Sequence, residues 1–206
     1  MRVLIAIPSM DQVPAQFAQA LATLNKVDEA ECLVAFQIGS LVYLSRDALA
    51  RKAVEYDADY ILWLDSDMVF DPDTLARLLQ DRESGDIISG LYFRRVHPFS
   101  PVLFDKLEIE EGKCEWTSFE KIPEDIFEIG GCGFGCVLMK TDIIFEITEK
   151  FGELFSPIGR VGEDLSFCWR ARQCGYRIVC DPKISLGHVG HHVVTRDFYE
   201  TYNKRK

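Results

Sequence analysis

The chain has 206 residues, 48% of them apolar and 27% charged, which is typical of a globular protein and too apolar for a disordered one. This length predicts one domain, large enough to bury a core that needs no disulfide or zinc ion. The formal net charge is −10, from 33 acidic and 23 basic residues, so the chain repels polyanions and we expect no nucleic-acid partner.

Strands and helices alternate along the first half of the chain. Compact apolar runs predict strands at residues 2–7, 32–38, 60–64 and 86–93. Helices are predicted between them, over residues 11–25, after an N-cap at Ser45, and up to residue 80 after an N-cap at Asp71. This order predicts an α/β fold, with a mostly parallel twisted sheet flanked by helices as in Rossmann-like proteins.

The pattern changes after Phe93. Residues 94–129 contain prolines and short mixed segments, which predict a small antiparallel part in the second half. Two further helices are predicted, over residues 141–150 and 161–175, and a last strand over 176–182. No linker or repeat interrupts the chain, so we expect a single domain over residues 1–195 and a C-terminal tail over 196–206.

Neither targeting signals nor a cysteine framework is apparent. The N-terminal apolar run is too short for a signal peptide, and no run approaches the ~18 apolar residues of a membrane span. The seven cysteines include no CxxC pair, and Cys132 and Cys136 lack a second pair for zinc. We therefore expect a cytoplasmic protein with no membrane span.

Two carboxylates follow the predicted strand at residues 60–64. Because strand side chains alternate, Asp65 and Asp67 can point the same way, at the strand end where α/β proteins bind ligands. Paired carboxylates suit Mg²⁺ or Mn²⁺ shared with substrate phosphates, and such an ion cancels their repulsion. The alternative is a polar turn that caps the next helix, a role that Asp71 already fills.

Three later features also suggest a site. The glycines of residues 130–135 let backbone amides approach a ligand, or make a tight bend. Glu163 and Asp164 fall in the first turn of a predicted helix, where the helix dipole keeps a carboxylate ionised as a general base requires, or where it simply favours negative charge. Histidines cluster at residues 188–192, and imidazole beside carboxylates suits Mn²⁺, with a zinc site as the alternative.

Six segments, in order, resemble motifs of the GT-A fold nucleotide-sugar glycosyltransferases of the family 2 type. They are AIPS (6–9) and SRDALARKA (45–53), similar to nucleotide-binding segments; LDSD (64–67), similar to the DxD motif; GGCGFG (130–135), similar to the glycine-rich loop; GED (162–164), similar to the xED motif; and GHVG (187–190), similar to the metal-binding histidine segment. The resemblance covers roughly residues 1 to 190.

The resemblance implies a metal-dependent enzyme that transfers a sugar from a nucleotide-diphosphate sugar, with UDP expected, to a carbohydrate or other hydroxyl acceptor with inversion. Asp65, Asp67 and His188 would hold Mn²⁺ or Mg²⁺, and Asp164 would be the base, with Glu163 in reserve. The nucleotide-sugar would contact Pro8, Ser9, Arg46, Asp47, Asp65, Ser66, Gly131 and Gly133. The family often has Asn at the position of Asp47, so this nucleotide contact departs from the family pattern.

The resemblance also divides the chain into a nucleotide- and metal-binding half (1–93) and an acceptor and catalytic half (94–195). Position suggests residues 92–119 for the acceptor, with Arg94, Arg95, Trp116 and Phe119. The chain is small for its class, which leaves room for an oligomer.

Two other classes remain open. One is a nucleotidyltransferase of similar fold, although residues 7–17 lack its glycine-rich, basic phosphate loop. The other is a non-catalytic nucleotide-sugar-binding module.

Overall fold

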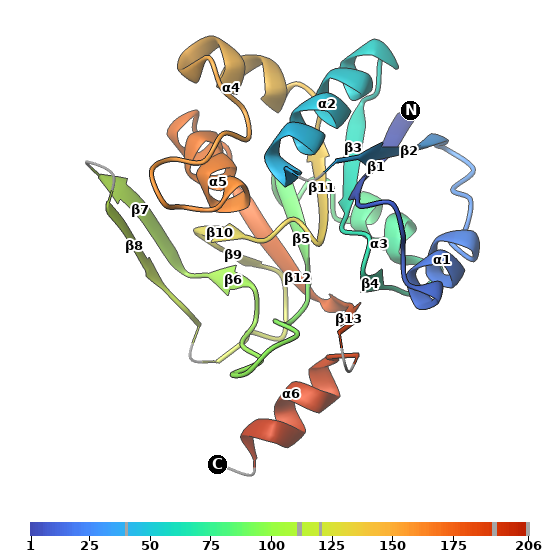
Figure 1. Cartoon of the computed structure of the whole chain (residues 1–206), viewed down its shortest axis with the longest axis vertical. Helices are drawn as coiled ribbons and strands as arrows, with labels where there is room; N and C mark the ends of the chain where they lie inside the picture. The colour runs from blue at the N-terminus through green and yellow to red at the C-terminus, as the bar shows by residue number, and fades with distance from the viewer. Residues whose placement is uncertain (40, 111–112, 120, 191–192, 205–206) are drawn as a thin grey trace.

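The computed structural model describes residues 1–39, 41–110, 113–119, 121–190 and 193–204. Its main sheet contains β1 (Arg2–Ser9), β2 (Glu31–Ile38), β3 (Tyr60–Leu64), β5 (Ile87–Leu91), β9 (Phe127–Glu128), β11 (Cys136–Lys140) and β12 (Ile178–Ser185). Their order is β2-β1-β3-β11-β5-β12-β9 (Figure 1). Only β11 and β9 run against the direction of the others, so the predicted mostly parallel sheet is confirmed.

Helices cover both faces of this sheet. They are α1 (Ala15–Ala22), α2 (Val42–Glu55), α3 (Thr74–Gln80), α4 (Ile143–Phe151) and α5 (Glu163–Gln173), while α6 (Arg196–Asn203) projects from the fold near β13 (Gly187–His188) (Figure 1). The apolar residues of α1 and α3 share one core with one face of the sheet, while those of α2, α4 and α5 share a second core with the other face. No helix in the described part of the chain is long and apolar enough to cross a membrane.

Two predicted helix caps were wrong. The residue before α2 is Leu41, and Ser45 is buried inside the helix rather than capping it. Asp73 precedes α3 in place of Asp71. A cap contributes only about 1 kcal/mol, so packing of the helix on the sheet can override it. Residues 196–206, expected to form a tail, contain α6.

Short antiparallel pairs complete the fold, as predicted for the second half. They join β6 (Leu103–Phe104) to β10 (Gly131–Cys132), β7 (Lys106–Glu110) to β8 (Lys113–Thr117), and β4 (Met68–Val69) to β13 (Gly187–His188). The last pair matters most, because it brings the chain near residue 188 beside the end of β3.

The glycine-rich segment packs tightly against Tyr92. A Cβ atom at Gly133 would lie 2.1 Å from the Tyr92 hydroxyl oxygen, and one at Gly135 would lie 2.7 Å from Cζ of the same ring. The Gly135 amide donates to this hydroxyl at 3.1 Å. The glycines therefore make room for a buried tyrosine between β5 and β11.

We expect Gly133→Ala to lower the free energy of unfolding by about 1–3 kcal/mol, because the new methyl group overlaps the Tyr92 hydroxyl. Urea unfolding gives the cost of Gly133→Ala in the wild type and in Tyr92→Phe, as a double-mutant cycle. The cost should be smaller in Tyr92→Phe, because removal of the hydroxyl relieves the overlap. Equal costs of Gly133→Ala in both backgrounds would contradict this explanation.

Candidate active site

A cavity of about 350 Å³ lies at the carboxyl ends of β1 and β3. The strand order reverses here, because β1 lies between β2 and β3 and the connecting helices α1 and α2 cover opposite faces. Ligands of open α/β sheets bind at such switch points. The cavity is lined by Pro8, Ser9, Met10, Gly39, Val42, Ser45, Arg46, Asp65, Ser66, Asp67, Arg95, Glu163, Asp164 and His188.

Most of the predicted site residues are brought together in this cavity. They are Pro8, Ser9, Arg46, Asp65, Ser66, Asp67, Glu163, Asp164 and His188. Asp47 lies outside it, because its carboxylate faces the other side of α2 and accepts a hydrogen bond from the Phe155 amide at 3.2 Å. Gly131 and Gly133 do not line it either, since they pack against Leu107 and Tyr92 respectively.

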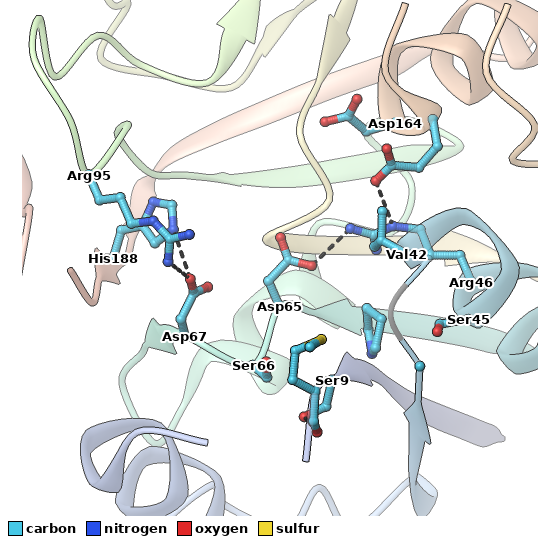
Figure 2. A pocket seen from close by; sticks show the side chains of 14 residues that line it. Ser9, Val42, Ser45, Arg46, Asp65, Ser66, Asp67, Arg95, Asp164 and His188 are labelled. Carbon is cyan, nitrogen blue, oxygen red and sulfur yellow. Dashed lines mark hydrogen bonds and ion pairs between the residues drawn. The ribbon is translucent and has the colours of Figure 1, made fainter. Parts of the chain in front are cut away.

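Arg46 connects three elements at the cavity wall. From α2, its Nη2 donates to Asp65 Oδ1 after β3 at 2.8 Å, and its Nε donates to Glu163 Oε1 at the start of α5 at 3.4 Å (Figure 2). Only 3% of the Arg46 side chain is exposed. One cation therefore fixes the positions of two of the cavity's carboxylates.

The surroundings of Arg46 keep it charged. Burial alone would lower the pKa of its guanidinium, but the carboxylates of Asp65, Glu163 and Asp164 raise the pKa above its usual value. The rings of Trp63, Phe134 and Phe155 lie 5.2–6.0 Å from the guanidinium carbon and favour the cation.

His188 meets Asp67 because β13 pairs with β4. His188 lies opposite Met68, and the Val189 amide donates to the Asp67 carbonyl at 2.8 Å. The imidazole Nε2 then lies 3.4 Å from Asp67 Oδ2, on the side of the carboxylate where Arg95 also forms an ion pair (Figure 2). Residues 121 positions apart in the sequence thus share one corner of the cavity.

The hydrogen bond of the second ring nitrogen of His188 determines which nitrogen of the neutral ring carries the hydrogen. Nδ1 lies 2.9 Å from the Phe93 carbonyl, which only accepts, so Nδ1 carries a hydrogen. A neutral ring therefore presents its Nε2 lone pair to the carboxylate, the arrangement of a metal-binding histidine. Without a metal ion, burial alone would lower the pKa of His188, but the hydrogen bond and charge of Asp67 raise it overall.

Asp67 and His188 fit a divalent ion, because an oxygen anion and an imidazole lone pair face each other and a cation between them removes their repulsion. Asp65 is turned toward Arg46 instead. Within the described part of the chain, no three His, Cys, Asp or Glu side chains converge as a ready metal cluster. The alternative candidates His191 and His192 lie outside the described residues.

Asp164 is the carboxylate of the cavity without a guanidinium partner among the described residues. Burial, together with the nearby charge of Glu163, raises its pKa to about 6, although the Leu165 amide donates to its Oδ1 at 2.8 Å. A carboxyl group with this pKa is ionised at neutral pH and still basic enough to accept a proton. The cavity therefore contains a polar corner at Asp67 and, at Asp164, a half-buried acid–base group.

Arg95, expected from its position in the chain to serve the acceptor together with Arg94, lines this cavity beside Asp67. Phe119, also expected to serve the acceptor, packs against Phe127 at a ring-centroid distance of 5.0 Å. Met10, Gly39, Val42 and Ser45 were not singled out as lining residues, and only their positions next to strand β1, strand β2 and Arg46 could have indicated them.

Comparison with known proteins gives structural matches only. No protein-family model matches the chain, and no curated protein sequence matches it significantly. The solved structure of A197 from STIV superposes with a TM-score of 0.68 and 21% identity, over 92% of this chain and 86% of that one.

A second match has a known ligand set. GalNAc-T7, solved with UDP, GalNAc and Mn²⁺, superposes with a TM-score of 0.62 and 10% identity, over 99% of this chain and 47% of that one. This chain thus spans about half the length of that protein. At these identities the likeness shows the fold alone. The chain has a mixed α/β, GT-A-like fold.

Proposed function

We propose that this chain is a metal-dependent glycosyltransferase that uses a nucleotide-diphosphate sugar, with UDP expected, and a hydroxyl acceptor. The observation that carries the proposal is one cavity, at the carboxyl ends of β1 and β3, with Asp67 and His188 at one side and half-buried Asp164 at another. The GT-A-like fold supports it, because GalNAc-T7 has this fold and was solved with UDP and Mn²⁺.

The donor would bind along the edge of the sheet. Asp67 and His188 would hold the metal ion, joined by the Asp65 oxygen that Arg46 does not bind, and the ion would neutralise charge on the departing diphosphate. Pro8, Ser9, Arg46 and Ser66 would line the nucleotide side of the cavity. Arg46 and Arg95 add positive charge that an anionic donor requires.

Asp164 would act on the acceptor. Its carboxylate would take the proton of the acceptor hydroxyl while that oxygen attacks the anomeric carbon, and the nucleotide diphosphate would leave from the opposite face of the sugar. One displacement of this kind inverts the anomeric configuration. Glu163 is held by Arg46. It would therefore hold Arg46 in place and would not accept the proton.

Loss of the Asp67 charge should abolish metal-dependent turnover. We expect release of UDP from a UDP-sugar to require Mn²⁺ or Mg²⁺, to stop with EDTA, and to fall about a hundredfold in Asp67→Asn. Asp71→Asn, an exposed change four residues along the chain, is the matched control and should retain activity.

Other outcomes of the same assay would replace the proposal. If Asp67→Asn turned over the donor as fast as the wild type, a metal-binding role of Asp67 would be excluded. Release of pyrophosphate from a nucleoside triphosphate would favour a nucleotidyltransferase, and tight UDP binding without turnover of any sugar donor would favour a binding module.

We expect removal of the Asp164 charge to lower the transfer rate and to raise the free energy of unfolding. Because folding raises the pKa of Asp164 from 3.8 to about 6, the folded state carries a half-buried charge above pH 6 that opposes folding, whereas below pH 4 the group is neutral in both states. We therefore expect Asp164→Asn to unfold with a free energy higher by on the order of 2 kcal/mol at pH 8, in EDTA, with the gain disappearing below pH 4.

The same variant should lose at least about a hundredfold in transfer rate, while wild-type activity rises with pH through an apparent pKa near 6. Urea unfolding at the two pH values and a pH–rate profile make the measurements. A stability gain independent of pH would refute the assigned burial of charge, and full activity of Asp164→Asn would refute its role as base.

A further inference from the structure

A second cavity of about 590 Å³ adjoins the first across two short backbone segments. Arg94 and Gly162 line the second cavity, while the next residues along the chain, Arg95 and Glu163, line the first. A Cβ atom added at Gly162 would lie 2.9 Å from Asp164 Oδ1, so the space beside Gly162 in the wall of the second cavity borders the carboxylate of the proposed base. A hydroxyl of a molecule bound there can therefore reach Asp164.

The charge of this cavity is opposite to that of the protein. Arg94 and Arg160 line it, and no acidic residue of the described part of the chain does, although the whole chain has 33 acidic and 23 basic residues. Arg46 and Arg95 each pair with a carboxylate, but neither Arg94 nor Arg160 has a side-chain hydrogen bond or ion pair among the described residues. Two guanidinium groups are thus available to an anion, and each can donate two parallel hydrogen bonds to a carboxylate or phosphate.

The part of the cavity wall away from the two arginines is mainly apolar and can contact the face of a ring. Trp116 projects from β8 with 56% of its surface exposed, and its ring packs edge-on against Phe104 at a centroid distance of 6.4 Å. Val102 and Leu165 extend this apolar surface. A flat aromatic face beside aliphatic groups can cover the apolar face of a sugar or another ring.

We propose that this cavity binds the acceptor and that the acceptor is an anion, a hydroxylated ring that carries a carboxylate or a phosphate. The acceptor role rests on the proposed glycosyltransfer. The ring would lie against Trp116, the anionic group would bind Arg94 and Arg160, and one hydroxyl would extend past Gly162 to Asp164.

Binding of matched probes tests the proposal without requiring turnover. Calorimetry compares 4-nitrophenyl β-D-glucuronide with 4-nitrophenyl β-D-glucoside, which differ only in the carboxylate, each with and without UDP and Mn²⁺. The 6-phosphate of the glucoside is the third probe and separates a preference for phosphate from one for carboxylate. We expect an anionic probe to bind about tenfold more tightly than the neutral one.

The double variant Arg94→Gln/Arg160→Gln should abolish this preference and leave the binding of the neutral probe unchanged. The double variant Arg51→Gln/Arg82→Gln removes the same number of positive charges at residues that do not line this cavity, so it controls for the change in net charge and should keep the preference. Both target residues are exposed, so urea unfolding should show a stability close to that of the wild type.

Three results would overturn the proposal: equal affinity for charged and neutral probes, a preference that survives in the double variant, or no binding of any probe in either condition. Because the probes are tested without donor as well, the two proposals fail separately. An anion preference in a protein that binds no UDP would retain the anion site and remove sugar transfer. UDP binding without an anion preference would remove the anion site and leave the proposed sugar transfer standing.

Discussion

The buried guanidinium of Arg46 is the interaction on which the rest of the site depends. Removing a cation from water costs several kcal/mol, and here the hydrogen-bonded carboxylates of Asp65 and Glu163 offset that cost, with aromatic rings around the cation. The carboxylates in turn need the cation, because they would otherwise repel each other in a chain of net charge −10. One ionic cluster thus joins α2, the end of β3 and the start of α5.

This cluster also separates the roles of the cavity's carboxylates. Glu163 and Asp65 are held by Arg46, while Asp67 faces His188 and Arg95 on the far side of Asp65 (Figure 2). Asp164 is half-buried and has no such partner among the described residues, and desolvation together with the charge of Glu163 raises its pKa to about 6. The polar corner suits a metal ion and a diphosphate, and the half-buried carboxylate suits a proton transfer, so environment rather than residue type assigns the chemistry.

Local sequence patterns were sufficient for the parallel strands β1, β2, β3, β5 and β12 and for the position of Asp65 and Asp67, because a buried strand needs an uninterrupted apolar run and its end is visible where charge begins. They did not predict β11, which runs antiparallel between β3 and β5, because strand pairing over that distance is non-local. His188 could be predicted only by resemblance, since the β4–β13 pairing that places it is non-local. Asp47 was placed at the nucleotide beside Arg46 by resemblance, but adjacent residues lie about 100° apart around a helix. Arg46 therefore faces the cavity while Asp47 faces the Phe155 amide. For Arg94 and Arg95, adjacent and chemically identical, no local signal indicates which of the two cavities each will line.

The central claim is that this cavity holds a divalent ion on a nucleotide diphosphate. A crystal grown with UDP and Mn²⁺, measured at the manganese absorption edge, tests it most directly. The account predicts an anomalous peak within coordination distance of Asp67 and His188, with UDP phosphate oxygens on the ion and the Asp67–Arg95 ion pair replaced. UDP bound with no manganese at these residues, or manganese bound elsewhere, would contradict it.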